Sequence, residues 1–319
     1  MTFQLNSPET PATAFAEDVR HHLQLVPRQL PSRYLYDPLG SALFDAICEL
    51  PWYPITRAEE RLLTAHRREI FDHLPGLRRI VELGPGDGRK LKTLVGGTTS
   101  ALTAHLVDVS SSALARAAHT LSDAATVTVV THQAPFEDGL NEIARLPPDG
   151  PLLALFLGSN IGNFDQPASL ALLRRIRTSL GPGGTLLVGA DLVKPERDLL
   201  NAYDDPLGVS AAFNLNVLLR INRELGGTFD LRAFRHRAVW NPGSSRMEMF
   251  VVSSRPQHVR IEAIDLDIDL DDGEAIWTES SYKYTAQGLA WHLVDAGFEP
   301  IAQWIDRDEA FALSLARSN

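Results

Sequence analysis

The feature that most constrains the fold of this 319-residue chain is a short apolar segment followed by three glycines at alternate positions. Residues 80–83 are β-branched and apolar apart from Glu82, which predicts a buried parallel strand that ends in a turn. Gly84, Gly86 and Gly88 carry no Cβ, so the backbone can turn sharply and approach a ligand closely. The stretch therefore predicts a cofactor-binding loop.

A second apolar segment, residues 104–109, contains Asp108 about twenty residues after these glycines, where doubly wound folds place a carboxylate that binds ribose hydroxyls. A dinucleotide-binding fold would need a further glycine at the start of the next helix, where this chain has Arg89 and Lys90. The Glu-x-Gly-x-Gly pattern with a later acidic strand end resembles a class I methyltransferase, whose ligand is S-adenosylmethionine.

Strand and helix patterns alternate through the middle of the chain. The predicted strands are residues 125–130, 152–157 and 185–188, and the predicted helices between them are residues 113–121 and 167–179. This alternation predicts a parallel, doubly wound α/β sheet whose ligands lie at the carboxyl ends of its strands. Asn160 and Asn163 follow one such strand end, where an amide suits either turn formation or the polar head of an amino acid.

The alternation stops between Lys194 and Tyr284. Residues 199–223 have helical spacing, and residues 234–240, 246–253 and 259–270 alternate as antiparallel strands, which predicts an inserted α+β domain with its own sheet. The chain closes with a helix at 286–296 and strands at 300–306 and 310–316, an arrangement that resembles the terminal hairpin of a methyltransferase sheet. We therefore predict a discontinuous substrate-binding domain (1–57 and 195–284) and a Rossmann-like methyltransferase domain (58–194 and 285–319).

Composition narrows the class of partner. A net charge of −10 argues against a general nucleic-acid surface and favours a small-molecule substrate. The single cysteine excludes an internal disulfide, the histidines are scattered without metal-ligand spacing, and no segment has the apolar length of a membrane span or a signal peptide. We expect a cytoplasmic monomer that contacts neither membrane nor nucleic acid and holds no metal.

Seven ordered motifs resemble the histidine N-alpha-methyltransferases of ergothioneine biosynthesis. They begin at Tyr36 (YDPLGSALFD), Leu50 (LPWYPITR), Phe156 (FLGSNIGN), Asp191 (DLVK), Ala202 (AYDD), Ala212 (AFNLN) and Thr278 (TESSYK). The resemblance extends from about residue 17 to the end of the chain and is more specific than any single glycine loop. It implies an S-adenosylmethionine-dependent enzyme that methylates the α-amino group of L-histidine, three times in succession, to give hercynine.

The same resemblance implies which residues bind histidine. Carried over by position, these are Tyr53, Asn163, Tyr203, Glu279 and Ser281, and Met249 would pack against the flank of the ring. Asparagine and tyrosine suit the substrate carboxylate, while a glutamate and a serine can pair with the two imidazole nitrogens. Without the resemblance, Glu279 would be read as a solvated charge at a strand end and Met249 as a core residue.

For the cofactor, the resemblance implies Gly84, Gly86, Lys90 and Asp108, with Phe136 at the adenine. The chain departs from the family pattern at Pro135, where an acidic residue would be expected to contact adenine; Glu137 and Asp138 are alternatives for that contact.

Methyl transfer from a sulfonium requires an uncharged amine aligned with the methyl group and shielded from water. We predict that Tyr36 or Tyr53 relays the amine proton, and that aromatic faces such as those of Tyr36, Tyr53 and Phe213 stabilise the developing quaternary ammonium. Two alternatives stay open: the same fold acting on tryptophan or arginine, and a catalytically silent member that only binds a ligand. The intact glycine loop and Asp108 argue against the silent member.

Overall fold

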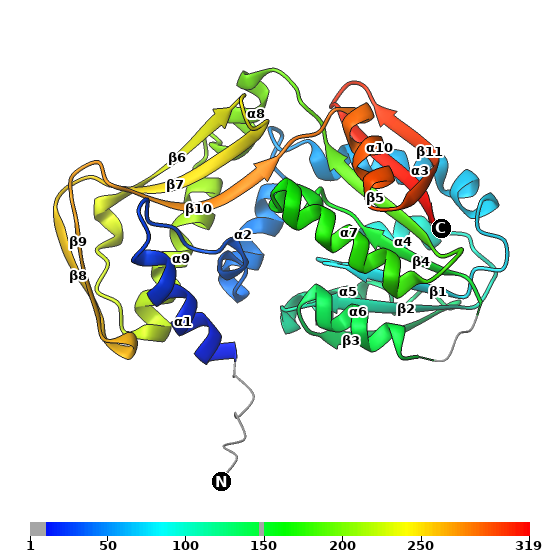
Figure 1. The fold of residues 1–319 in the computed structure, drawn as a ribbon, viewed down its shortest axis with the longest axis horizontal. Helices are drawn as coiled ribbons and strands as arrows, with labels where there is room; N and C mark the ends of the chain where they lie inside the picture. The colour runs from blue at the N-terminus through cyan, green and yellow to red at the C-terminus, as the bar shows by residue number, and fades with distance from the viewer. Residues whose placement is uncertain (1–10, 147–149) are drawn as a thin grey trace, which may run out of the picture. The chain divides into compact units, whose positions relative to one another are not determined.

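The computed structural model describes residues 11–146 and 150–319, which divide into two compact units (Figure 1). We call one the insertion unit: the described part of Met1–Ile47, with Tyr203–Trp240 and Glu248–Ser280. We call the other the sheet unit: Cys48–Ala202, Asn241–Met247 and Ser281–Asn319, as far as described. The predicted domain boundaries after residues 57, 194 and 284 stay a prediction, and residues 1–10 lie outside the described part of the chain.

A seven-stranded sheet with the order β11-β12-β5-β4-β1-β2-β3 forms the centre of the sheet unit. The neighbouring strands from β3 to β5 are parallel: β1 (Arg79–Leu83), β2 (Leu102–Asp108), β3 (Val127–Gln133), β4 (Leu152–Phe156) and β5 (Thr185–Asp191). Strand β12 (Phe311–Ser318) pairs antiparallel with both β5 and β11 (Phe298–Asp306). The predicted parallel α/β sheet with a terminal hairpin is confirmed.

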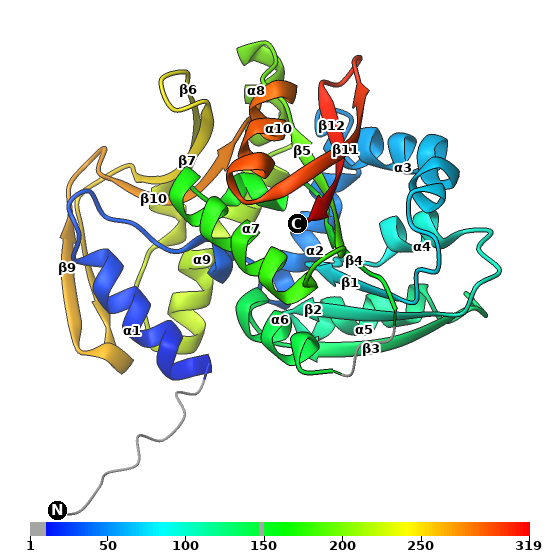
Figure 2. The same ribbon diagram turned by 45° about the vertical axis from the view of Figure 1, so that its right-hand side comes forward.

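Helices cover both faces of this sheet, as Figures 1 and 2 show. On one face lie α3 (Ile55–Asp72), α4 (Arg89–Val95) and α5 (Ser111–Thr120); on the other lie α6 (Phe136–Ala144), α7 (Gln166–Leu180) and α10 (Ala286–Asp295). The second face encloses one continuous apolar core of side chains from β1, β4, β5, α6, α7 and α10. With both faces covered, β4 and β5 are buried along their whole length, which explains their unbroken apolar sequences.

Several of these helices begin where the sequence supplies a cap. Ser110 Oγ accepts from the amide of Ala113 at the start of α5, and Asp165 does the same for Ala168 at the start of α7. These caps fix where each helix leaves the carboxyl edge of the sheet.

The insertion unit combines helices with two small sheets. It contains α1 (Pro11–Leu23), α2 (Pro38–Cys48, which ends at the unit boundary) and α9 (Val209–Leu225). One sheet has the order β10-β7-β6 and the other pairs β8 with β9; their bounds are β6 (Phe234–Asn241), β7 (Arg246–Ser253), β8 (Gln257–Ile261), β9 (Leu266–Leu270) and β10 (Ala275–Tyr282). No helix in the described ranges is long and apolar enough to cross a bilayer.

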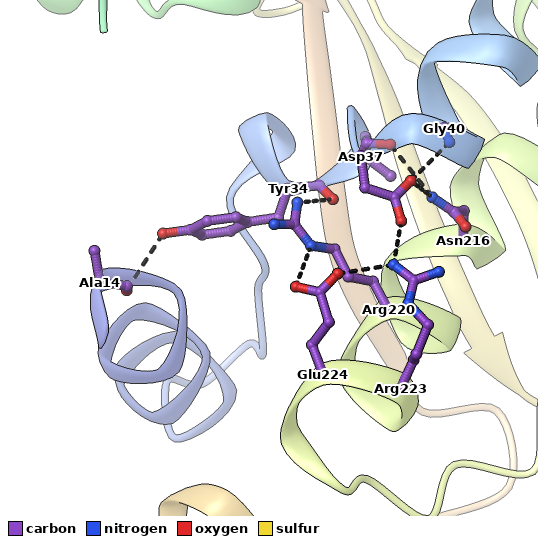
Figure 3. Close-up of polar contacts among 9 residues, drawn as sticks. Ala14, Tyr34, Asp37, Gly40, Asn216, Arg220, Arg223 and Glu224 are labelled. Atoms are coloured by element: carbon purple, nitrogen blue, oxygen red, sulfur yellow. Dashed lines mark hydrogen bonds and ion pairs between the residues drawn. The ribbon is translucent and has the colours of Figure 1, made fainter. Parts of the chain in front are cut away.

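Asp37 fixes the segment of the insertion unit that carries Tyr36 (Figure 3). Its carboxylate accepts from the backbone amide of Gly40 (2.7 Å), from Asn216 Nδ2 (2.7 Å) and from the Arg223 guanidinium (2.6 Å). Burial alone would raise the pKa of Asp37, but these donors together lower it below its ordinary value. A buried carboxylate thus ties the start of α2 to α9.

The prediction of one helix over residues 199–223 is wrong. The structure has two helices, α8 (Glu196–Tyr203) and α9, separated by a turn. Asp205 makes this turn, since its carboxylate accepts from the amides of Leu207, Val209 and Ser210 and so caps α9. Gly208 follows with a φ of 75°, which a continuous helix cannot contain.

The prediction of a single strand over residues 259–270 is also wrong. A short 3₁₀ turn (Glu262–Ile264) divides it into the hairpin strands β8 and β9, and Asp265 leaves the turn with a φ of 48°. The insertion therefore has two sheets where the pattern predicts one. Strand β10 and helix α6 are additions to the predicted elements.

Candidate active site

The three glycines of the loop after β1 serve different purposes. All have positive φ: 72° at Gly84, 59° at Gly86 and 80° at Gly88. A Cβ on Gly84 would lie 2.8 Å from Asn160 Nδ2, and one on Gly88 would lie 2.9 Å from the Ala117 Cα. A Cβ on Gly86 would face open space. Gly84 and Gly88 therefore permit close packing within the fold, while Gly86 keeps the outer side of the loop accessible to a ligand.

Two carboxylates lie beside this loop at the same edge of the sheet. Strands β1 and β2 pair Leu83 with Val107. Asp108 therefore lies level with Gly84, one residue past the end of β1. The Asp108 carboxylate accepts from the amide of Ser110 at 2.8 Å. Burial raises the pKa of Asp108, against the lowering effect of that amide.

Glu82 is the more unusual carboxylate. It is 1% exposed, and its Oε2 has no hydrogen-bond partner among the described residues. Burial raises the pKa of Glu82 to about 8, opposed by the charge of Lys90. A buried polar atom without a partner costs free energy, so a cationic ligand that reaches Glu82 would relieve that cost.

Lys90, a predicted cofactor residue, forms an ion pair with Glu59. Its Nζ lies 2.6 Å from Glu59 Oε2, and the Glu59 carboxylate also accepts from the backbone amide of Gly158 at 2.8 and 3.0 Å. Burial works against the charge of Lys90, but Glu59 outweighs it and raises the pKa of Lys90 above its ordinary value. The pair connects the start of α4 to the loop after β4.

Asn160, in the loop after β4, and Phe136, at the start of α6, lie at the same edge of the sheet beside Gly84. Asn160 and Asn163 are the first and last residues of a 3₁₀ turn (Asn160–Asn163). Phe136, the first residue of α6, packs edge-on against Phe156 with ring centroids 5.8 Å apart, and its Cζ is 3.5 Å from where a Gly84 Cβ would lie. The sheet unit thus gathers Gly84, Phe136 and Asn160 in one place.

Taken together, this edge offers what a charged adenosyl ligand requires: an accessible glycine, a carboxylate at a strand end, an aromatic ring, and a buried carboxylate oxygen that has no hydrogen-bond partner in the described part of the chain. The residues therefore fit S-adenosylmethionine. No cluster of three or more His, Cys, Asp or Glu side chains suited to a metal occurs within the residues that the structure describes.

The residues predicted to bind histidine are distributed over both units. Tyr53, Asn163 and Ser281 belong to the sheet unit, and Tyr203, Met249 and Glu279 belong to the insertion unit, as does Tyr36, the predicted proton relay. Glu279 and Ser281 lie two apart on β10, so their side chains share one face of that strand.

Within the insertion unit, the Tyr36 ring lies in an aromatic cluster. Its centroid is 5.5 Å from that of Phe44 and 5.3 Å from that of Phe213, both with near-perpendicular planes. Tyr203 is fixed through its backbone, because His236 Nε2 lies 2.8 Å from the Tyr203 carbonyl oxygen. A carbonyl can only accept, so His236 donates from Nε2.

A family model described as histidine-specific, SAM-dependent methyltransferase matches residues 15–318. The chain belongs to this family. It is therefore an S-adenosylmethionine-dependent methyltransferase, which confirms the cofactor and the enzyme class inferred from the motifs. Members of the family are described as histidine-specific, in agreement with the resemblance found in the sequence.

Curated relatives cover nearly the whole chain. The histidine N-alpha-methyltransferase of Mycolicibacterium smegmatis is 38% identical over 97% of this chain and 96% of its own length. That of Mycobacterium tuberculosis is 39% identical over 95% of this chain and 94% of its own. An L-tryptophan methyltransferase of Psilocybe serbica is more distant, at 26% identity over 92% of this chain and 89% of its own.

Sequence reasoning gave no role to Glu59 or Glu82. Glu82 was visible as an acidic residue inside an apolar strand next to the glycine loop, a signal that points to a ligand. Glu59 carried no such signal, because one of its partners is Gly158, 99 residues away.

Proposed function

We propose that this enzyme transfers methyl groups from S-adenosylmethionine to the α-amino group of L-histidine, three times in succession, and so forms hercynine for ergothioneine biosynthesis. The observation that carries the proposal is the match of a histidine-specific family over residues 15–318. The two mycobacterial histidine N-alpha-methyltransferases support it, since their similarity extends over nearly the full length of both chains.

In this proposal the sheet unit holds the cofactor. Gly86 lets the backbone approach it, Gly84 lets Asn160 pack against the same loop, and Asp108 accepts from the ribose hydroxyls. The buried carboxylate of Glu82 faces the cofactor's ammonium group, a role favoured by its Oε2, which no described residue hydrogen-bonds. Phe136 packs on the adenine.

Lys90 is proposed to act at the cofactor edge mainly by holding Glu59, because its ammonium is already in an ion pair with that carboxylate. Lys90 is thus proposed to position the loop that contains Gly158, and not to be a direct ligand of the cofactor.

For the substrate, Asn163 and Tyr203 donate to the α-carboxylate, and Glu279 and Ser281 pair with the two imidazole nitrogens. Met249, which is 3% exposed, packs against the ring flank. An apolar side chain in the place of imidazole would offer the Glu279 carboxylate no donor, and the lost pairing would disfavour that substrate.

S-adenosylmethionine supplies a methyl group bonded to a sulfonium. Because the sulfonium is already a good leaving group, the transfer needs no covalent help from the protein. The side chains therefore orient the amine, exclude water and remove a proton. Tyr36 or Tyr53 relays the proton from the α-ammonium to water, because its hydroxyl accepts that proton while releasing its own. The aromatic faces of Tyr36 and Phe213 stabilise the quaternary ammonium that accumulates on the nitrogen.

A second candidate is methylation of tryptophan, which the more distant Psilocybe serbica relative favours. The two candidates differ at Glu279 and Ser281, since an indole ring has one N–H donor and no acceptor nitrogen and can therefore pair with only one of these side chains. The test is kcat/KM for histidine, tryptophan and arginine, measured separately at saturating cofactor. A preference of at least about 100-fold for histidine supports the proposal; an equal or higher value for tryptophan or arginine overturns it.

The proposal extends to the cellular compartment and the oligomeric state of the enzyme. We propose that the enzyme acts in the cytoplasm as a monomer on a free amino acid, in keeping with its net charge of −10 and its single cysteine. Light scattering of the purified protein tests the monomer, and a mass of twice the chain would contradict it.

A further inference from the structure

A half-buried histidine of β6 holds the residue that ends α8. His236 Nε2 lies 2.8 Å from the carbonyl oxygen of Tyr203, and both residues belong to the insertion unit. Tyr203 is the last residue of α8, so no amide of the same helix reaches its carbonyl. The imidazole N–H takes the place of that amide, and His236 thereby caps the helix with its side chain.

The opposite nitrogen of the His236 ring is held by Asn214 of α9. Asn214 is 3% exposed, and its Nδ2 lies 2.8 Å from His236 Nδ1 and 3.0 Å from the carbonyl oxygen of Phe250 on β7. The Asn214 Oδ1 is buried and has no hydrogen-bond partner among the described residues. The two contacts of the nitrogen therefore decide how this amide is oriented.

The Phe250 carbonyl sets the direction of these hydrogen bonds. A carbonyl only accepts, so the amide nitrogen of Asn214 must face it. The second N–H of that nitrogen is then directed at His236 Nδ1, which must be an unprotonated acceptor. A neutral imidazole without hydrogen on Nδ1 carries it on Nε2, the atom that faces the Tyr203 carbonyl. Asn214 thus selects the tautomer that His236 needs to cap α8.

Charges around His236 act in both directions. The Tyr203 carbonyl and the carboxylates of Asp204 and Asp205 favour an imidazolium, whereas burial favours the neutral ring. Burial is the largest of these effects and lowers the pKa of His236 below its ordinary value of 6.5. Near neutral pH the ring is therefore uncharged, in agreement with the hydrogen bond that Asn214 donates to it.

We propose that His236 is a positioning residue for substrate selection: by capping α8 at Tyr203, it holds the Tyr203 hydroxyl where it binds the α-carboxylate, so that the enzyme prefers free histidine to histidine with a blocked carboxylate. The inference rests on the proposed function, in which Tyr203 donates to that carboxylate. It concerns where the Tyr203 backbone lies. It requires no unoccupied hydroxyl, since a hydroxyl can donate to the substrate while it accepts from another group.

The test compares L-histidine with L-histidinamide, which has the same ring and α-amino group but no carboxylate. Each ligand is titrated by calorimetry into enzyme saturated with S-adenosylhomocysteine, which has no methyl group to transfer. The preference is the ratio of the two dissociation constants, and variants are compared at one pH, so the different basicities of the two amines cancel. Wild type should prefer histidine by at least about tenfold. Equal affinity for the two ligands would overturn the inference.

Two substitutions of His236 separate the contacts of its ring. A glutamine places an amide N–H near the position of Nε2 and can still cap Tyr203, whereas the shorter asparagine reaches only the position of Nδ1. His236→Gln is therefore the matched control and should keep the wild-type preference within about twofold. His236→Asn should reduce the preference about three- to tenfold through weaker binding of histidine, and should leave histidinamide binding within about twofold of wild type.

Three outcomes of this comparison would refute the positioning role. They are an unchanged preference in His236→Asn, an equal weakening of both ligands in that variant, and a loss in His236→Gln as large as in His236→Asn. The second outcome is the one that a purely structural role of His236 predicts, because a general loss of structure does not distinguish a carboxylate from an amide.

Tyr203→Phe shows whether His236 acts through the tyrosine. This variant removes the hydroxyl but keeps the ring and the backbone carbonyl, so it should lower the preference by itself. If His236 acts through Tyr203, adding His236→Asn to Tyr203→Phe should lower the preference by less than a further twofold or so. A further loss as large as that caused by His236→Asn alone would overturn the inference.

His236→Phe gives a second variant if His236→Asn does not fold, because it keeps a ring at this position and removes the N–H. It should lower the preference as His236→Asn does, and a wild-type preference in this variant would count against the inference. Turnover of histidine by the wild type with S-adenosylmethionine tests the proposed function separately. Its absence overturns both proposals, whereas turnover together with a preference that does not depend on His236 overturns the inference alone.

Discussion

At the scale of single residues, the proposed selectivity for histidine depends on Glu279 and Ser281 together, because an indole ring with one N–H can pair with only one of them. We expect Glu279→Ala to lower kcat/KM for histidine about 10- to 100-fold, because a charge-assisted hydrogen bond to the ring is lost. The affinity for S-adenosylhomocysteine, measured by calorimetry, should stay within about twofold of wild type. Glu279→Gln, which keeps the size of the side chain, is the matched control and should lose less. An equal loss of histidine and cofactor binding in Glu279→Ala would show that Glu279 is structural.

Replacing Glu82 with glutamine is predicted to raise the stability of the unliganded protein and to weaken its binding of the cofactor. Its folded-state pKa of about 8 lies above the ordinary value of 4.5, so the folded protein binds one more proton than the unfolded chain between these values. Stability of the unliganded protein is therefore lost as pH rises from 4.5 to 8. Glu82→Gln, which cannot ionise, should be more stable than wild type at pH 7, by an amount on the order of a few kcal/mol at most.

The measurement is urea unfolding of unliganded wild type and Glu82→Gln at several pH values between 4.5 and 8, with cofactor titrations beside it. The stability difference should shrink towards pH 4.5, and the variant should bind S-adenosylmethionine at least about tenfold more weakly. A variant that is less stable at neutral pH, or that binds the cofactor as wild type does, would refute the proposed role of Glu82.

These residues also show what the sequence can and cannot reveal. Asp108 was predicted from its distance to the glycine loop, because the spacing of consecutive strands in a parallel sheet is nearly constant. Glu59 was not, since its contact with Gly158 forms only when two distant segments of chain fold together. His236 was given no role, because both partners of its ring lie on helices and not on its own strand.

At the scale of elements, substitutions at two positions of the glycine loop are predicted to have different effects. Gly88→Ala should destabilise the protein by about 1–3 kcal/mol, because the new Cβ adds a clash with the backbone of α5 to an unfavourable positive φ. Gly86→Ala should cost about 1 kcal/mol or less, since its Cβ faces open space, and should mainly weaken cofactor binding.

Thermal unfolding with and without S-adenosylhomocysteine distinguishes the two variants. Gly88→Ala should melt earlier but retain most of the ligand-induced rise in Tm, while Gly86→Ala should melt near wild type and lose most of that rise. Early melting of Gly86→Ala together with loss of the ligand-induced rise in Tm in Gly88→Ala would contradict the roles assigned to the two glycines.

Element boundaries show where pattern reasoning loses information. The break between α8 and α9 was signalled by Pro206 and Gly208, yet apolar spacing on both sides was regular enough to suggest one helix. The sequence of the β8–β9 hairpin resembles one strand because apolar and polar residues alternate in both halves, at Val259 and Ile261 and again at Leu266, Ile268 and Leu270. The turn between them shifts the phase of the alternation by one residue, and the period alone does not show that shift.

At the scale of the whole molecule, the sheet unit was predictable because its central strands β1, β4 and β5 are almost wholly buried and its loops carry turn residues. The insertion was harder to predict, since strands such as β6 and β8 are partly exposed and their apolar patterns are weaker. The histidine assignment came from ordered motifs across nearly the full chain. No single helix or strand is sufficient for the histidine assignment.

The most direct test of the central claim is tandem mass spectrometry of an equimolar mixture of the twenty amino acids, incubated with the enzyme and trideuteromethyl S-adenosylmethionine. The account predicts that label enters histidine alone, that one to three labelled methyl groups appear in sequence, and that fragmentation places them all on the α-nitrogen. Label on the imidazole ring, or on another amino acid in preference to histidine, would contradict it.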